Sequence, residues 1–314
     1  MVEQVKVAYV FPGQSSWAVG MGLDIFLHYA SAREVFDEVD RVLGFSLSRL
    51  CFEGPEEELI QTFNVQPAVL ATSIACLKAA QEVSGESMPA ATFLAGHGLG
   101  EYAALVAGNA VSLADAVCLV RERGRLMHEA GRRKPGGMLT IVGLEQGIVE
   151  YICLNTGTTI SNINSPSQIV ISGAEDNLTK AWRLARTKGA RRITPLKVSG
   201  AFYSPMMEPA TAGLSEATSS FTFRDSSVPI VANVTAQPVT DVKSIKEELV
   251  SQLYRCIQWR DSIENMIARG VTNFFEIGHG EVLTGLIKQI SPGVRTFNVG
   301  DLTSVREIAK WRRM

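Results

Sequence analysis

Short β-branched runs alternate with longer helix-patterned segments along almost the whole chain of 314 residues. The runs expected as buried strands cover residues 5–11, 92–95, 139–142, 169–172, 192–196, 228–234, 273–277 and 296–299. The segments with helical spacing cover residues 30–43, 65–83, 99–107, 113–130, 175–188 and 244–267. Because parallel strands need helical crossovers, this order predicts an α/β fold with a mostly parallel sheet covered on both faces.

A smaller unit is expected where this alternation changes character. Residues 131–137 read Gly-Arg-Arg-Lys-Pro-Gly-Gly, a basic and turn-rich joint. Three short strands and two helical stretches follow, in a β-α-β-β-α-β-like order that is typical of a ferredoxin-like unit. We therefore expect a large domain made of residues 1–131 and 199–314, with a small subdomain of residues 132–198 inserted between them.

Composition excludes several classes of protein. Lys and Arg number 30 against 32 Asp and Glu, a net charge of −2, which argues against a strongly cationic nucleic-acid binder. No apolar run reaches the roughly 18 residues of a membrane span, and the N-terminus lacks the pattern of a signal peptide. The five cysteines are odd in number and widely spaced, which favours buried thiols over disulfides or a zinc site. We expect a soluble, cytoplasmic protein without a metal.

The most informative motif is Gly96-His97-Gly98-Leu99-Gly100, between an expected strand and an expected helix. This is the frame of a nucleophile elbow, G-x-S-x-G, which exposes a serine hydroxyl beside backbone N–H groups that stabilise an oxyanion. Gly98 occupies the central position, and glycine accepts the backbone angles of such a turn. The turn is therefore expected to survive while its hydroxyl is absent.

Two other interpretations of these glycines remain open. A dinucleotide-binding G-x-G-x-x-G would need its third glycine at position 101, which holds Glu101, and that carboxylate would repel a pyrophosphate. A plain tight turn with no function would also explain the glycines.

Several spaced motifs, the elbow among them, make the chain resemble the malonyl-CoA:acyl carrier protein transacylase family, which includes stand-alone acyltransferases that serve polyketide synthases. The resemblance covers nearly the whole chain and implies an α/β-hydrolase-like large domain, a ferredoxin-like insert and a site in the cleft. The motifs are Phe11-Pro-Gly-Gln14, Gly96-His97-x-Leu99-Gly100-Glu101-Tyr102, the arginine-rich stretch around Arg123, Gly136-Gly137-Met138, Asn164-Ser-Pro-Ser-Gln168-Ile-Val-Ile-Ser-Gly173, Gly200-Ala-Phe-Tyr203, Gln258-Trp259 and the stretch from Glu276 to Ile287.

The resemblance implies a serine–histidine enzyme that moves malonyl from coenzyme A to the phosphopantetheine thiol of a carrier protein. Gly98 stands where the family has its nucleophilic Ser, and Tyr203 stands where it has its general-base His. Arg123 matches the arginine that pairs with the malonyl carboxylate. Three further matches are implied: Gln14 and Leu99 for the oxyanion N–H groups, Gln258 for the residue that orients the histidine, and Phe202 for the bulky residue that accompanies malonyl specificity.

Two more departures from the family pattern lie near the same pocket. The first motif ends Ser15-Ser16-Trp17 where the family continues Gly-Ser-Gln, and the late loop reads Gly278-His279-Gly280 where the family has Gly-Pro-Gly. The changes lie where the catalytic residues are expected, while the motifs of the scaffold match the family. We therefore expect a natural lineage whose site has lost its catalytic residues or has been reused. Trp17 is a candidate for closing the pocket.

Three further side chains belong to motifs around the pocket. His97 is expected to be structural or to line the pocket and adds no new base, because the family also has a histidine there. His279 follows a strand at the sheet edge where sites form, so it either activates a water or a thiol or is an ordinary solvated loop histidine. Tyr203, whose ordinary pKa is about 10, either donates a hydrogen bond to a bound carbonyl or plugs the site.

The resulting hypothesis is a transacylase-like protein of polyketide or fatty-acid synthesis that lacks conventional Ser-His transfer. It would bind acyl thioesters or run another reaction on them; the alternative is an active acyltransferase or thioester hydrolase with a non-standard catalytic group. No cofactor is expected to stay bound, and the ligand would be a coenzyme A thioester or a phosphopantetheine arm. The expected partner is an acidic acyl carrier protein near the basic stretches 121–134 and 180–197, unless these are ordinary solvated faces. A polyketide synthase or a partner acyltransferase is a further candidate.

Overall fold

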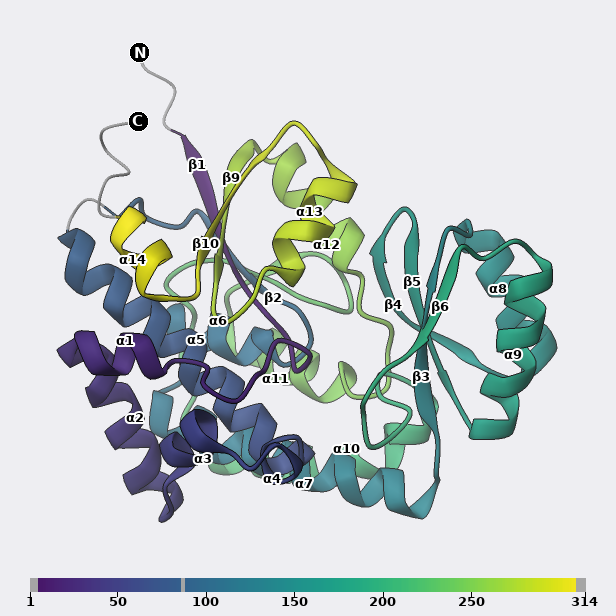
Figure 1. Cartoon of the computed structure of the whole chain (residues 1–314), viewed down its shortest axis with the longest axis horizontal. Helices are drawn as coiled ribbons and strands as arrows, with labels where there is room; N and C mark the ends of the chain where they lie inside the picture. The colour runs from purple at the N-terminus through teal and green to yellow at the C-terminus, as the bar shows by residue number, and fades with distance from the viewer. Residues whose placement is uncertain (1–4, 86–87, 309–314) are drawn as a thin grey trace.

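The computed structural model describes residues 5–85 and 88–308, and its larger sheet has six strands in the order β10-β9-β1-β2-β7-β8 (Figure 1). All neighbours pair in parallel except β7 and β8, which form an antiparallel edge. The strands are β1 (Lys6–Phe11), β2 (Phe93–Gly96), β7 (Ile230–Val231), β8 (Pro238–Val239), β9 (Val271–Ile277) and β10 (Arg295–Val299). The predicted fold class, α/β with a mostly parallel sheet, is confirmed.

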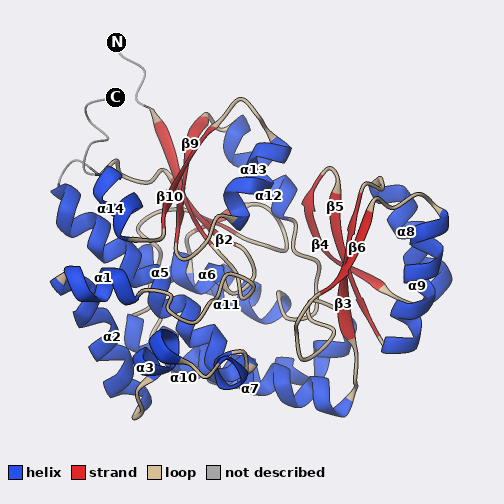
Figure 2. Cartoon of the chain, in the orientation of Figure 1, coloured by secondary structure: helices blue, strands red, loops and turns tan. Residues whose placement is uncertain are grey.

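Helices surround this sheet and complete the main hydrophobic core (Figure 2). The long helix α5 is buried along most of its length, which fits its nearly continuous apolar sequence. The helices outside the small sheet are α1 (Leu23–His28), α2 (Ala30–Leu43), α3 (Leu47–Glu53), α4 (Glu56–Leu59), α5 (Thr62–Ser84), α6 (Gly100–Ala107), α7 (Leu113–Arg133), the 3₁₀ helix η2 (Pro205–Ala210), α10 (Thr211–Ser220), α11 (Val242–Ser251), α12 (Trp259–Ala268), α13 (Val282–Ile290) and α14 (Leu302–Ile308).

The small unit is a four-stranded antiparallel sheet in the order β4-β5-β3-β6. It comprises β3 (Gly137–Val142), α8 (Gln146–Thr156), β4 (Thr159–Ser165), β5 (Gln168–Gly173), α9 (Glu175–Thr187) and β6 (Arg192–Pro195). Figure 2 shows α8 and α9 together on one face of the sheet. The β-α-β-β-α-β order matches the prediction, but there are four strands and not three. The domain boundaries at 131/132 and 198/199 stay a prediction.

Two predicted elements are wrong in extent. Residues 244–267 do not form one helix, because Ile257 leaves the helical path between α11 and α12 to bond β4: its N–H donates to the Ser161 carbonyl at 2.8 Å, and its carbonyl accepts from the Ile163 N–H at 2.9 Å. The strand expected over 228–234 shrinks to Ile230–Val231, because the chain then turns toward β8.

No helix in residues 5–85 and 88–308 is long and apolar enough to cross a membrane. All five cysteines are free thiols, and three of them are buried.

Candidate functional site

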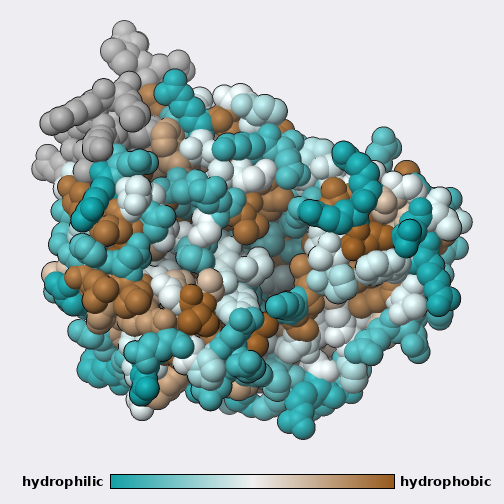
Figure 3. Space-filling model, viewed as in Figure 1, coloured by the Kyte–Doolittle hydropathy of each residue, from teal (hydrophilic) through white to brown (hydrophobic). Residues whose placement is uncertain are grey.

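A cavity of about 410 Å³ lies between the small sheet and the larger part of the molecule. The face shown in Figure 3 is hollowed between these two parts. Strand residues alternate between faces, so the apolar odd-numbered residues of β3, β5 and β6 pack on α8 and α9 while the even-numbered ones face the cavity. The small sheet lines the cavity with Met138, Thr140, Asn162, Asn164, Gln168, Val170, Arg192 and Thr194.

The predicted elbow is present at the opposite wall, between β2 and α6. Gly98 has φ +57°, in the left-handed region that favours glycine. Asn233 holds the turn on both sides: its Oδ1 accepts from the Gly98 N–H at 2.7 Å, and its Nδ2 donates to the Gly96 carbonyl at 2.7 Å. The strand-to-helix turn therefore survives without a serine, as the sequence predicts.

Tyr203 fills the space that a side chain at position 98 would need. A Cβ atom on Gly98 would lie 2.2 Å from the Tyr203 hydroxyl oxygen and 3.0 Å from its Cζ. The phenol oxygen thus occupies roughly the place of a serine hydroxyl. Tyr203 itself has φ +54°, a strained conformation for a residue with a bulky side chain. Tyr203 in this position therefore requires a residue without a side chain at position 98.

Arg123 lies close behind the elbow but is fully buried and does not line the cavity. Its Nη1 donates to Gln66 Oε1 at 2.8 Å, and its Nη2 donates to Gln252 Oε1 at 2.9 Å. Gln252 Nε2 in turn donates to the Gly98 carbonyl at 3.1 Å and to the Glu101 carboxylate. The Gln252 side-chain amide therefore links the guanidinium to the elbow. The Arg123 Nε has no hydrogen-bond partner among the described residues.

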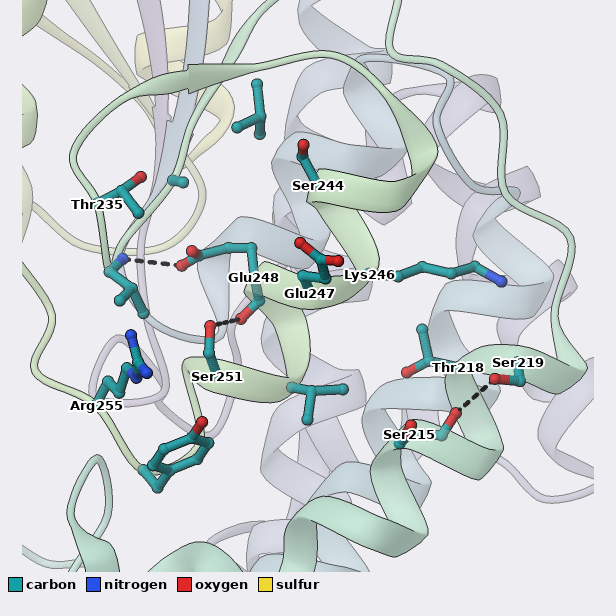
Figure 4. A pocket seen from close by; sticks show the side chains of 15 residues that line it. Ser215, Thr218, Ser219, Thr235, Ser244, Lys246, Glu247, Glu248, Ser251 and Arg255 are labelled. Atoms are coloured by element: carbon teal, nitrogen blue, oxygen red, sulfur yellow. Dashed lines mark hydrogen bonds between the residues drawn. The ribbon is translucent and has the colours of Figure 1, made fainter.

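Two buried carboxyl groups support this network. Burial, reinforced by the charge of Glu248, raises the pKa of Glu101 well above its ordinary range. Burial also raises the pKa of Glu248 to about 7. Glu248 lines a second cavity of about 630 Å³, where its Oε1 accepts from the Val234 N–H at 2.8 Å (Figure 4). Because Val234 follows Asn233, Glu248 indirectly supports the elbow.

Glu248→Gln is expected to raise the free energy of unfolding by about 2 kcal/mol at pH 8 and to change it little at pH 5. The folded state holds the Glu248 proton more tightly than the unfolded chain, so stability from this group falls as pH rises from about 4.5 to about 7. The amide keeps an acceptor for the Val234 N–H and carries no charge. Urea unfolding at both pH values measures the difference; an equal effect at pH 5 and pH 8 would contradict the assigned titration.

His97 lines the cavity from the elbow and is half-buried. Its Nε2 lies 2.8 Å from Asn164 Oδ1, and its ring meets the edge of Trp259. Burial lowers the pKa of His97, with the Asn164 hydrogen bond opposing the shift, so the ring is neutral at pH 7. His97 thus joins the elbow to the small sheet while facing the cavity, which agrees with its predicted place.

The two predicted oxyanion donors are available. Within residues 5–85 and 88–308, neither the Gln14 N–H nor the Leu99 N–H makes a hydrogen bond to another residue. The two loops touch, because a Cβ on Gly13 would lie 2.5 Å from the His97 carbonyl oxygen. Gln14 and Phe202 both line the cavity. This arrangement can still receive a carbonyl oxygen.

Three predicted site residues lie elsewhere. Trp17 packs on the main core, because the loop after Gln14 folds back toward α3. His279 is outside the cavity lining, because its loop turns toward β10 through the Gly278 N–H bond to Val299 at 3.0 Å. Gln258 bonds the Asn233 carbonyl with its backbone N–H, and its side chain makes no hydrogen bond in the described part of the chain. A tyrosine at position 203 offers no imidazole for it to orient.

Three site residues are absent from the predictions: Asn233, Gln252 and Gln66. Asn233 follows a strand at its carboxyl end, the edge where α/β sites form, and that signal could have found it. Gln66 and Gln252 lie within or just after helices and carry no local signal.

The two basic stretches differ in exposure. In 121–134, Arg123 is buried, Arg125 pairs with Glu122 and Glu129, and the half-buried Arg121 donates to Asn64 and lies over the Phe45 ring, so the exposed cationic group of this stretch is residues 132–134. In 180–197 every basic side chain is exposed, and Arg192 also reaches the cavity. These residues are Lys180, Arg183, Arg186, Lys188, Arg191, Arg192 and Lys197.

Comparison with known proteins agrees with this architecture. Residues 8–313 match the model of the acyl transferase domain family, and the chain belongs to that family. It is 43% identical over 301 residues to a malonyl CoA-acyl carrier protein transacylase of Bacillus subtilis, covering 94% of each chain. It is 40% identical over 289 residues to the Escherichia coli K12 protein of that name, covering 91% of this chain and 93% of the other.

Two solved structures show the same fold. The acyl-carrier-protein-S-malonyltransferase of Bartonella henselae superposes with a TM-score of 0.94 at 37% identity, over 99% of this chain and 100% of that one. A malonyl-transacylase in complex with its type II PKS acyl-carrier protein superposes with a TM-score of 0.93 at 35% identity, over 97% and 99%. The chain is thus a member of the malonyl CoA-acyl carrier protein transacylase group.

Proposed function

We propose that this protein binds acyl thioesters of coenzyme A or of a carrier protein without forming an acyl-enzyme at the elbow. The observation that carries the proposal is the Tyr203 hydroxyl, which lies where a side chain at position 98 would be. Neither Gly98 nor Tyr203 supplies the serine–histidine pair that the family resemblance implies. The cavity, the Gln14 and Leu99 N–H groups and Phe202 support retained binding.

Three features argue against the alternative of an enzyme with a non-standard catalytic group. His279, the side chain suggested for that role, is not part of the cavity lining. His97 is neutral at pH 7, but its Nε2 is engaged by Asn164. Ser15 is exposed beside the cavity, and no hydrogen bond links it to a base within the described residues.

The partner that we propose is an acyl carrier protein of fatty-acid or polyketide synthesis. The relatives named as transacylases of acyl carrier protein support it, as does the solved complex with a type II PKS acyl-carrier protein. Of the exposed basic side chains of 180–197, Arg192 lines the cavity and Lys197 lies between the lining residues Leu196 and Val198, where both would attract an acidic partner; those of α9 lie on the other face of the small sheet. A polyketide synthase or a partner acyltransferase remains a further candidate, and the free cysteines support a cytoplasmic location.

Incubation with labelled malonyl-CoA is expected to leave the intact mass of the protein unchanged, because Gly98 carries no hydroxyl and the Tyr203 phenol at the turn stands where the general-base histidine would be. Isothermal titration with coenzyme A thioesters and with holo carrier protein is expected to show binding. Transfer of label to carrier protein is expected to stay at the uncatalysed rate. A covalently malonylated protein, or transfer well above background, would overturn the proposal, and so would the absence of any thioester or carrier-protein binding.

A further inference from the structure

We propose that Tyr203 closes a latent carboxylate site at Arg123, so that the cleft does not distinguish malonyl from uncharged acyl thioesters. This inference rests on the proposed function, because it concerns the ligand that the same cleft receives. The inference adds that Tyr203 determines the acyl specificity of the cleft. It also adds that the carboxylate site at Arg123 is intact and that the Tyr203 side chain blocks access to it.

The closed site has the chemistry of a carboxylate receptor. Arg123 carries five N–H donors in a planar fork, and its hydrogen bonds to Gln66 and Gln252 use two of them. Its Nε is buried without a partner, and no carboxylate lies within ion-pair distance of the guanidinium in the described part of the chain. A buried cation with unused donors is costly and favours an anionic ligand once one can reach it.

Tyr203 stands between this cation and the cavity. Of the group formed by Gly98, Tyr102, Arg123 and Tyr203, only Tyr203 lines the cavity. Its hydroxyl oxygen lies against Gly98, whose carbonyl accepts from Gln252, the partner of Arg123. The Tyr102 ring also lies 5.5 Å from the Arg123 guanidinium, and burial raises the pKa of Tyr102 while the charge of Arg123 opposes that rise. A ligand carboxylate coming from the cavity would therefore meet the phenol first.

The open part of the cavity suits an uncharged acyl group. Its lining combines the apolar Val170, Phe202, Leu283 and Leu286 with uncharged polar side chains of the small sheet. Among the described residues that line the cavity, Arg192 is the only cation, and it is an exposed residue of the edge strand β6. Arg192 can attract the phosphates of coenzyme A as well as a carboxylate, so it gives no selectivity for malonyl over acetyl.

Tyr203→Gly is the variant that opens the site with the least risk to folding. It removes the ring, and glycine adopts φ +54° without the strain of the tyrosine. Tyr203→Phe is the matched control, because it keeps the ring and removes only the hydroxyl. The double variant Tyr203→Gly with Arg123→Met tests whether the guanidinium is the receptor.

Isothermal titration of each variant with malonyl-CoA, acetyl-CoA and coenzyme A measures the selectivity. In the native protein and in Tyr203→Phe the Kd values for malonyl-CoA and acetyl-CoA are expected to agree within about twofold. Tyr203→Gly is expected to bind malonyl-CoA about tenfold more tightly than acetyl-CoA, which corresponds to one charge-assisted contact of about 1.4 kcal/mol. The double variant is expected to lose that preference.

The outcomes separate this inference from the proposed function. A native protein that binds malonyl-CoA tenfold more tightly than acetyl-CoA would overturn the closed site and leave thioester binding standing. Equal affinities in a folded Tyr203→Gly variant would overturn the latent receptor, with folding checked by thermal unfolding. No binding of any thioester would overturn the proposed function itself.

Discussion

Gly98→Ser combined with Tyr203→His is expected to restore acylation from malonyl-CoA, with a rate at least about 10³-fold above the native protein. In a well-studied serine hydrolase the loss of the nucleophile or the base costs about 10⁶ in turnover, and the second loss adds little because the two act as a unit. Each single variant is therefore expected to remain silent. Intact mass after incubation with malonyl-CoA, with the adduct located by peptide mapping, gives the measurement.

The single variant Gly98→Ser has a second reason to fail. Its Cβ would lie 2.2 Å from the Tyr203 hydroxyl oxygen, far inside contact distance, and φ at position 98 is +57°. Replacement of Tyr203 removes the clash with its hydroxyl. The two hydrogen bonds that Asn233 makes to Gly96 and Gly98 hold the turn in its conformation although a serine there has a positive φ. Gly98→Ala with Tyr203→His is the matched control, because it has the same backbone demand and no hydroxyl. A folded Ser/His double variant that takes no acyl group would mean that the cradle is not intact.

The sequence predicts the fold best where burial alone sets the pattern, as in a strand buried on both faces or a helix with one apolar stripe. The helix expected over 30–43 coincides with α2, and the strands expected over 5–11 and 273–277 match β1 and β9 closely, because both are buried on both faces and read as apolar runs. Strand β4 was missed. Its sequence Thr-Ile-Ser-Asn-Ile-Asn-Ser places asparagines on the cavity face, so it reads as a loop until the cavity is known.

The candidate site is predictable from sequence only where one local motif carries it. The elbow and Tyr203 each lie in a contiguous motif, and the structure brings them into contact. The support behind them comes from Gln66, Asn233 and Gln252, which are far apart in the chain and polar in otherwise ordinary segments. Their roles depend on three segments that converge after folding, and no spacing rule within one segment encodes that convergence. His279 shows that a local signal can also mislead. Its position after a strand suggests a place at the site, but the direction of its loop depends on the contact with β10, which the local sequence does not encode.

Gly100→Ala is expected to destabilise the protein by at least about 3 kcal/mol, or to prevent folding, although it adds a single methyl group. A Cβ at position 100 would lie 2.1 Å from the Phe11 carbonyl oxygen and 2.7 Å from the Pro12 carbonyl oxygen. These are backbone atoms of β1 and of the loop that follows it, so they cannot rotate away. The first turn of α6 sits directly on the end of β1, and this contact sets the place of the elbow relative to Gln14.

Gly147→Ala is the matched control for that substitution. Gly147 lies in the first turn of α8, and a Cβ there meets nothing within 4 Å. Alanine is the better helix former, so this variant is expected to gain up to about 1 kcal/mol. Urea unfolding of both variants against the native protein gives the comparison. If Gly100→Ala unfolds within about 0.5 kcal/mol of the native protein, β1 and α6 are not in contact at the elbow, and the geometry of the oxyanion donors would have to be built differently.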